Sequence, residues 1–286
     1  MLPEFELLMP RTLSEALEML AQAGEGVAPV AGGTNLVVDM RGGRHRPSVL
    51  VSVAGLEELR GIRREDGHVV IGATTTVAEL LEEPLIAEAA PVLWSAARVF
   101  ANPLVRNRAT VGGNLADASP AADTAPPLLV LDAEVQLASK EGSRWVPLDE
   151  FFLGVRQTLR QPDELLTAVR FPLPPSGAFG GFHKLGLRKA DAISVASVAV
   201  MMEVGDDGTC RKARIAMGAV APKPIRAYEA EKRLEGHVLT PELVAEAARL
   251  CAEATSPIDD IRASAAYRKH VVEVLARRLL SEGKEK

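Results

Sequence analysis

The chain has 286 residues, of which 47% are hydrophobic, so it is long enough for about two domains with cores of their own. Its 38 acidic residues outnumber its 33 basic ones and the net charge is −5, which excludes the basic excess typical of nucleic-acid-binding proteins. Two cysteines, Cys210 and Cys251, exclude a disulfide framework and a four-cysteine iron–sulfur site within this chain.

Neither a metal site nor a membrane span is expected. The five histidines are scattered without the spacing of metal ligands. Residues 1–6 lack the apolar core of a signal peptide, and the longest apolar stretch, residues 192–204, is interrupted by serines and too short to cross a bilayer. We therefore expect a cytoplasmic protein without a nucleic-acid partner. The basic runs at residues 41–46 and 60–64 are interpreted as solvated loops.

The first 54 residues have the pattern of a small α/β unit with parallel strands. Thr12 and Glu15 form a capping box that opens a helix, and Gly24 ends it. A buried strand over residues 27–31, a Gly-Gly turn, a helical start over residues 34–40 and a strand over residues 47–53 follow. We expect residues 1–54 to form one subdomain.

Residues 55–175 are predicted to form a second subdomain with a mixed or antiparallel sheet and several helices. Apolar and alternating runs predict strands over residues 67–73, 134–138 and 166–171. Thr76 caps one helix, a longer helix is expected from Ile86 to Phe100, and another begins at Pro126.

A proline-rich segment, residues 171–177, is interpreted as the linker to a C-terminal domain over residues 176–286, because prolines interrupt a strand ladder. Three segments, about 179–187, 194–204 and 211–219, predict a three-stranded antiparallel meander. Two helices follow, capped by Thr240 and Ser264. The last is expected to bury one stripe, consisting of Tyr267, Val271, Val274, Leu275 and Leu279.

Two Gly-Gly motifs are the most informative feature of the chain. The first is Ala31-Gly32-Gly33-Thr34-Asn35, between a buried strand and a helical start. Such a turn offers backbone N–H groups to an anion without a Cβ in the way, and the helix start favours negative charge. A plain turn explains this motif equally well by itself.

The second motif runs from Asn102 to Asp123 and includes Arg106-Asn107-Arg108-Ala109-Thr110-Val111-Gly112-Gly113-Asn114 and, further on, Ser119-Pro120. The two motifs, in this order, resemble those of the FAD-binding subunit of molybdenum hydroxylases, the family of carbon monoxide dehydrogenase and xanthine dehydrogenase. The similarity extends from about residue 3 to the C-terminus. It implies an α+β fold in which two FAD-binding subdomains precede the C-terminal sheet with its helical cluster.

The resemblance implies FAD held between the first two subdomains, its diphosphate accepting hydrogen bonds from both motifs. The first motif then contributes Val30, Ala31, Gly32, Gly33, Thr34 and Asn35. The second contributes Thr110, Gly113, Asn114, Ser119 and Asp123, with Phe100, Ala101 and Asn102 lining the pocket. No His or Cys adjoins either motif, so the FAD is expected to be non-covalent.

Three of the implied FAD contacts have alternative explanations. Asp123 is suited to accept hydrogen bonds from ribityl hydroxyls, but also to cap the helix before Pro126. Lys184 falls where the family has a lysine near the flavin, but would also suit an exposed edge strand. Leu166 matches an apolar pocket residue, and core packing explains it as well.

The resemblance also implies partners. A large subunit with molybdenum cofactor would oxidise a substrate, a small subunit would relay electrons through [2Fe-2S] clusters, and FAD on this chain would pass them to quinone, oxygen or NAD. A dimer of heterotrimers is the expected assembly. No catalytic residue is predicted. The alternatives are a stand-alone flavin oxidoreductase with its own substrate, and a non-redox assembly module of the same fold.

Overall fold

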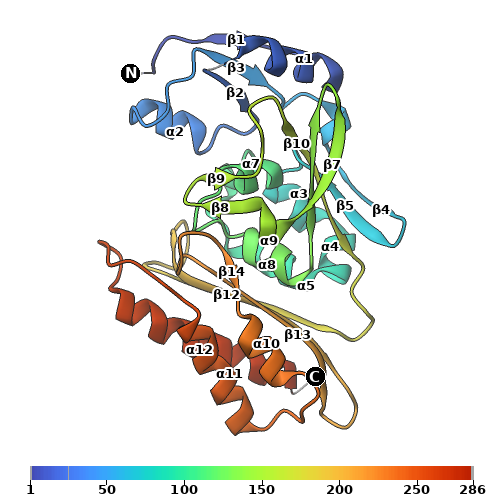
Figure 1. The fold of residues 1–286 in the computed structure, drawn as a ribbon, viewed down its shortest axis with the longest axis vertical. Helices are drawn as coiled ribbons and strands as arrows, with labels where there is room; N and C mark the ends of the chain where they lie inside the picture. The colour runs from blue at the N-terminus through green and yellow to red at the C-terminus, as the bar shows by residue number, and fades with distance from the viewer. Residues whose placement is uncertain (1, 25, 285–286) are drawn as a thin grey trace.

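The computed structural model describes residues 2–24 and 26–284. Three parts are stacked along the long axis of the molecule in chain order, with the N-terminal part at the top of Figure 1 and the C-terminal helices at the bottom. Each part has its own sheet, and the predicted α+β class is confirmed.

The N-terminal part contains a three-stranded parallel sheet in the order β1-β3-β2. Its elements are β1 (Glu6–Leu8), α1 (Leu13–Ala23), β2 (Val27–Val30), α2 (Leu36–Arg41) and β3 (Val49–Ser52). Half of the predicted capping box of α1 is present. The Thr12 side chain accepts a hydrogen bond from the Glu15 N–H, but the Glu15 carboxylate accepts the Arg11 N–H instead of that of Thr12. Leu17 and Leu20 of α1 share a core with Leu165 of the second sheet, which fixes this part on the next one.

The middle part is built on a five-stranded antiparallel sheet in the order β4-β5-β10-β6-β7. These strands are β4 (Ile62–Glu65), β5 (His68–Gly72), β6 (Glu134–Ser139), β7 (Gly142–Pro147) and β10 (Leu165–Pro172). In β6, buried Val135 and Leu137 alternate with the less buried Glu134 and Gln136, so one face of the sheet packs against helices.

The helices of the middle part are short. They are the 3₁₀ helix η1 (Glu57–Leu59), α3 (Val77–Glu82), α4 (Pro84–Ala89), α5 (Pro91–Val99), α6 (Pro103–Arg106), α7 (Val111–Ala116), α8 (Ala125–Val130) and α9 (Leu148–Phe151), and a hairpin of β8 (Phe152–Gly154) and β9 (Gln157–Thr158) follows α9. The single helix expected from Ile86 to Phe100 is wrong. Pro91 cannot continue α4, because it has no backbone N–H, and it instead begins α5.

Two loop interpretations also need correction. Residues 60–64, expected to be a solvated loop, include most of the edge strand β4, whose arginines are exposed while its backbone pairs with β5. The proline-rich linker begins later than expected, because Phe171 and Pro172 still pair with β5. Proline is accepted at this position because the strand ends there.

The C-terminal part is a four-stranded antiparallel sheet, β11-β12-β13-β14, one strand more than predicted because the two-residue β14 pairs with β13. The strands are β11 (Phe179–Gly186), β12 (Ser194–Val204), β13 (Cys210–Gly218) and β14 (Ile225–Arg226), and the helices are α10 (Tyr228–Leu234), α11 (Pro241–Glu253) and α12 (Ala265–Lys284). The predicted stripe of α12 is wrong at Tyr267, whose side chain is half exposed.

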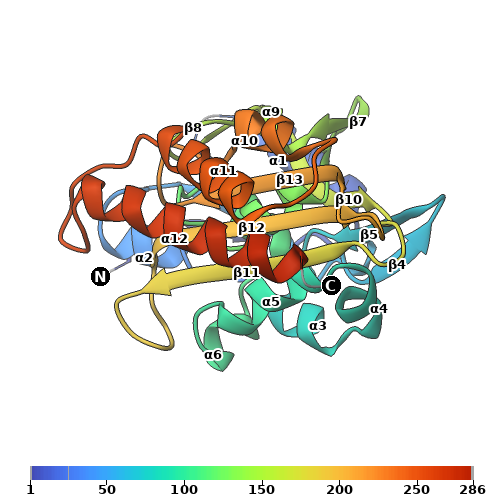
Figure 2. The ribbon, with the colours of Figure 1, turned by 90° about the horizontal axis from the view of Figure 1, so that it is seen from below.

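The C-terminal sheet is buried on both faces. Val198, Val200 and Met202 of β12 pack into a core with α11 and α12, whereas Ala199 and Met201, which point the other way, belong to the core of the middle part. Figure 1 shows this sheet between the two sets of helices, and from below α11 and α12 lie in front of its strands (Figure 2). The C-terminal part is therefore packed firmly on the middle part.

The loop before α12 should make folding stability depend on pH at the acid end. Burial acts to raise the pKa of Asp260, but hydrogen bonds from Arg262 and Arg268 outweigh it and lower the pKa from 3.8 to about 2. A carboxylate with a lowered pKa stabilises the fold above pH 4, and this contribution is lost as the pH falls through 2. Asp260→Asn should therefore lower the melting temperature at pH 7 and have little effect near pH 2. Thermal unfolding across this range tests it, with exposed Asp206→Asn as the control. If Asp260→Asn lowered the melting temperature equally at both pH values, the acid dependence could not come from the lowered pKa of Asp260.

Candidate nucleotide-binding site

The first glycine motif is a turn between β2 and α2, as predicted. Gly33 has a φ of +70°, a conformation that glycine adopts at little cost. Within the described residues, the backbone N–H groups of residues 32–35 donate no hydrogen bond. Asn35 occupies the N-cap position of α2 without making a side-chain cap. The turn therefore presents a row of unused donors, which is the arrangement that an anion such as a diphosphate requires.

The second glycine motif has a different structure, because its glycines lie in the first turn of α7. Thr110 is the N-cap of this helix, and its hydroxyl accepts a hydrogen bond from the Gly113 N–H at 3.1 Å. The Gly112 N–H donates to the Ala73 carbonyl at 2.9 Å, and a Cβ on Gly112 would lie 2.6 Å from that of Ala73. Gly112 therefore serves close packing, whereas Gly113 lies at the exposed surface.

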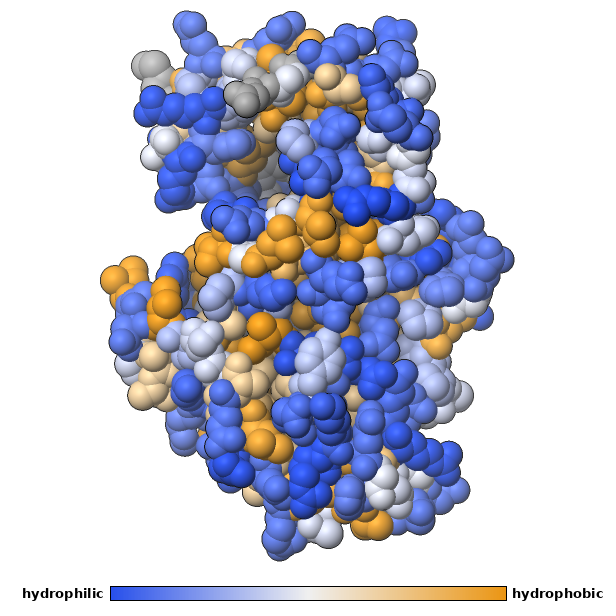
Figure 3. All heavy atoms as spheres, in the orientation of Figure 1, coloured by the Kyte–Doolittle hydropathy of each residue, from blue (hydrophilic) through white to orange (hydrophobic). Residues whose placement is uncertain are grey.

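The fold brings the two motifs into direct contact. A Cβ on Gly32 would lie 1.7 Å from the carbonyl oxygen of Arg108, so only glycine allows the two backbones to approach this closely. The Asn35 side chain donates a hydrogen bond to Asp117, at the end of α7, at 2.8 Å. In Figure 1, α7 lies below α2, nearer the middle of the view. In Figure 3 the surface is indented at this level, along the left edge of the view.

A buried ion pair closes the lower end of this region. The ammonium of Lys184 on β11 lies 2.6 Å from Oδ2 of Asp123, and the Ser194 hydroxyl donates to Oδ1 at 2.6 Å. The Lys184 side chain is only 6% exposed, so its interpretation as an exposed edge-strand lysine is wrong. Asp123 does not cap α8 either, because both of its oxygens face the C-terminal part. Burial raises the pKa of Asp123, although Lys184 and Ser194 act to lower it.

The remaining predicted residues surround the second motif. Asn102 caps α6 by accepting the Val105 N–H, and the Asn114 side chain accepts the Thr124 hydroxyl at 2.6 Å. Ala101 has a φ of +37°, and its carbonyl accepts the Asp191 N–H from the loop before β12. Phe100 and Leu166 are buried in the core of the middle part. Of this group, Asn102 and Asn114 already use their side-chain oxygens within the chain.

Two polar residues of this region carried no local sequence signal. Ser194 is the first residue of β12, and only the packing of β12 against α8 brings it to Asp123. Arg156, in the turn of the β8–β9 hairpin, contacts Asp39 and Asp117, which are 117 and 39 residues away in the chain. Only the tertiary structure identifies both residues.

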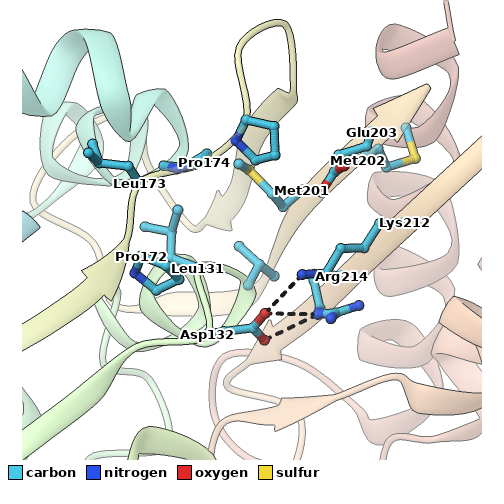
Figure 4. Close-up of a pocket in the computed structure, with 12 residues that line it drawn as sticks. Leu131, Asp132, Pro172, Leu173, Pro174, Met201, Met202, Glu203, Lys212 and Arg214 are labelled. Carbon is cyan, nitrogen blue, oxygen red and sulfur yellow. Dashed lines mark hydrogen bonds and ion pairs between the residues drawn. The ribbon is translucent and has the colours of Figure 1, made fainter. Parts of the chain in front are cut away.

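A cavity elsewhere in the molecule is not part of this region. It has a volume of about 230 Å³ and lies between the linker after β10 and strands β12 and β13. Figure 4 shows its apolar wall, which includes Leu131 and Met201, and the ion pairs of Asp132 with Lys212 and Arg214. The two cations that line the cavity are therefore paired with a carboxylate, unlike the turn at residues 32–35.

The described residues offer neither a cluster of metal ligands nor a membrane-spanning helix. Over residues 2–24 and 26–284, no three His, Cys, Asp or Glu side chains are grouped so that they could hold a metal ion. No helix in the same part of the chain is both long and apolar enough to cross a membrane.

The fold and the two apposed glycine motifs define a nucleotide-binding α+β protein with an additional C-terminal sheet. Two family models match the chain: the FAD binding domain in molybdopterin dehydrogenase over residues 3–174, and the CO dehydrogenase flavoprotein C-terminal domain over residues 182–282. The chain therefore belongs to the FAD-binding medium subunits of the molybdenum hydroxylases, which are oxidoreductases that act as complexes. The family predicted from the motifs is confirmed.

Individual relatives are similar in sequence to this chain over nearly its whole length. The carbon monoxide dehydrogenase medium chain of Hydrogenophaga pseudoflava is 33% identical over 279 residues, which are 98% of this chain and 96% of that one. The putative xanthine dehydrogenase FAD-binding subunit XdhB of Escherichia coli (strain K12) is 33% identical over 273 residues, covering 95% and 93%.

Solved structures agree as well. A carbon monoxide dehydrogenase structure from Hydrogenophaga pseudoflava matches with a TM-score of 0.96 and 34% identity, covering 99% of this chain and 98% of that one. Quinoline 2-oxidoreductase from Pseudomonas putida 86 matches with a TM-score of 0.93 and 29% identity, covering 100% and 98%.

Replacing Gly32 should separate the two motifs. In Gly32→Ala the new Cβ would collide with the Arg108 carbonyl, and the backbones must move apart. We expect a loss of about 3 kcal/mol or more of unfolding free energy, at the upper end of overpacking costs. Gly55→Ala is the matched control, since no atom lies within 4 Å of its Cβ, and it should change stability by less than about 0.5 kcal/mol. Urea denaturation measures both. Equal stability of the two variants would disprove the close contact.

Removing Lys184 should leave the buried Asp123 carboxylate without its cation. Lys184→Met keeps the volume of the side chain, and we expect a loss of about 3–5 kcal/mol. The double variant Lys184→Met/Asp123→Asn should recover part of this, because the remaining group is neutral. Lys232→Met, which breaks a solvent-exposed pair with Glu229, is the control and should have little effect on stability. If Lys184→Met is no worse than this control in urea denaturation, the ion pair is not buried as described.

Proposed function

We propose that this chain binds FAD non-covalently between residues 1–54 and residues 55–175, with residues 176–286 closing the site. The observation that carries the proposal is the row of unused backbone N–H donors at residues 32–35, held directly against the second glycine motif. A diphosphate with charges on both phosphates is the part of FAD that such donors would satisfy. The residues present therefore fit the cofactor that defines the family.

The proposed FAD contacts are those predicted from the sequence. The backbone and side chains of the first motif, Val30, Ala31, Gly32, Gly33, Thr34 and Asn35, would hold the diphosphate together with Thr110, Gly113 and Asn114. Phe100, Ala101, Asn102, Ser119 and Leu166 would line the remainder of the pocket. Gly113 is the best placed of the second motif, because it lies at the surface and its N–H is held only by the Thr110 hydroxyl.

Lys184 and Asp123 would set the electrostatics of the site. When bound, FAD accepts electrons and passes them on, and the protein contributes the position and the surrounding charges. The Lys184 ammonium is buried, and a buried cation favours negative charge nearby more strongly than an exposed one. Asp123 holds this ammonium in place through its Oδ2. Lys184 would thereby favour uptake of electrons at the site.

The function proposed for the whole chain is electron transfer within a molybdenum hydroxylase complex. Relatives are named as a medium chain, as FAD-binding subunits or as a subunit of a dehydrogenase complex. By analogy, a small subunit with [2Fe-2S] clusters would deliver electrons that a large subunit with molybdenum cofactor removes from a substrate. The external acceptor would be quinone, oxygen or NAD. A cytoplasmic dimer of heterotrimers is the proposed assembly.

The proposal is tested with the purified chain and its complex. We expect the chain, incubated with FAD and freed of excess, to retain one FAD that denaturation releases unchanged. In the complex, substrate should bleach the visible flavin band, whereas the FAD-loaded chain alone should not respond to the same substrate. Failure to retain flavin, alone and in the complex, would favour a non-redox assembly role. Bleaching of the isolated chain by substrate would favour a stand-alone flavin oxidoreductase.

A further inference from the structure

Arg156 occupies a constrained position beside the two glycine motifs. It lies in the turn of the β8–β9 hairpin with a φ of +55°, a conformation that non-glycine residues rarely adopt. Its backbone N–H donates to the Ala118 carbonyl at 3.0 Å, which ties the turn to the segment after α7. Figure 3 shows apolar surface at the level of this hairpin, where Leu153 and Val155 are exposed. The backbone thus directs Arg156 toward the motifs while its neighbours face solvent.

The Arg156 guanidinium joins α2, which follows the first motif, to the end of α7, which begins within the second motif. One nitrogen, Nη1, donates to Asp39 of α2 at 2.6 Å and to Asp117, at the end of α7, at 2.9 Å. Asp39 lies six residues after Gly33, and Asp117 lies four residues after Gly113. One side chain from a third segment therefore holds both motifs.

The network continues beyond Arg156 on both sides. The second oxygen of Asp117 accepts the Asn35 amide at 2.8 Å, which leads back to the first motif. Oδ1 of Asp39 accepts Nε of Arg44 at 2.8 Å. Asp39 is only 6% exposed. Burial acts to raise the pKa of Asp39, but Arg44 and Arg156 lower it below its usual value. This carboxylate therefore stays charged and is stabilised by both arginines.

We infer that Arg156 is a positioning residue of the FAD site, which fixes the placement of the first glycine motif relative to the second through Asp39 and Asp117. The inference rests on the proposed FAD binding. Gly32 sets how closely the motifs approach each other, and the core that α1 shares with the second sheet holds the two parts together elsewhere. The Arg156 network adds an attachment between α2 and the end of α7, close to both motifs. Without it, the donors of residues 32–35 would be held less well for the diphosphate.

The test compares affinities for FAD and riboflavin, because riboflavin lacks the diphosphate. Arg156→Gln should weaken FAD binding about tenfold or more, as expected for loss of a charge-assisted hydrogen bond, and leave riboflavin affinity unchanged. Arg156→Lys keeps the charge and should recover part of the loss. Asp117→Asn removes the carboxylate that Arg156 contacts at the end of α7, and it should lower the affinity for FAD to a similar extent. Arg63→Gln, which breaks an exposed pair with Glu65, is the matched control and should bind FAD normally.

Each outcome separates this inference from the proposed function. Wild-type protein that binds no FAD would overturn both. Wild-type protein that binds FAD, with Arg156→Gln and Asp117→Asn binding it equally well, would overturn only the role of Arg156. If the affinities for FAD and riboflavin fall to the same extent, Arg156 supports the fold in general. This result would also overturn its role as a positioning residue of the FAD site. If Arg156→Gln does not fold, the FAD and riboflavin affinities of Arg156→Lys and Asp117→Asn take its place. Normal FAD binding by both variants would then overturn the role of Arg156.

Discussion

The arrangement of the site depends on the contact between Gly32 and the carbonyl of Arg108. Gly32 follows β2 of the N-terminal sheet, and Arg108 lies between α6 and α7 of the middle part. A Cβ would lie 1.7 Å from the carbonyl oxygen, so the absence of a side chain is what allows the approach. Within the described residues, the N–H groups of residues 32–35 have no protein partner, and such donors are tolerated where water or a ligand can satisfy them. The contact therefore places a turn with unused donors directly against the second motif.

The C-terminal sheet brings a buried charged pair to the lower end of the region between the two motifs. Because β12 buries residues on both faces, the sheet is held between α11 and α12 on one side and the middle part on the other. This packing places Lys184 and Ser194 against Asp123. Removing two charges from water is costly, so the pair needs the additional hydrogen bond from Ser194 and firm packing on both sides. The ammonium is thereby fixed rather than mobile, as a role beside a cofactor requires.

The sequence predicted the features that depend on local signals. The turn at Gly32 and Gly33 follows from its motif, and the parallel and antiparallel sheets follow from hydrophobic patterns. Lys184 was singled out by the resemblance to the family. The features that the sequence did not predict depend on contacts between distant residues, or on a single residue that overrides the surrounding hydrophobic pattern. Pro91 interrupts a helix whose apolar pattern continues through it. Arg156 and Ser194 become significant only when residues far apart in the chain meet, and the helical conformation of Gly112 follows from its packing on Ala73.

Hydrogen–deuterium exchange of the backbone amides, with and without FAD, is the most direct test of the central claim that the two glycine motifs hold one diphosphate. Amides that acquire a hydrogen-bond partner exchange more slowly. We expect the amides of residues 32–35, which have no partner within the described residues, to become strongly protected when FAD binds. If FAD binds and these amides exchange as fast as before, the diphosphate does not lie on the first glycine motif.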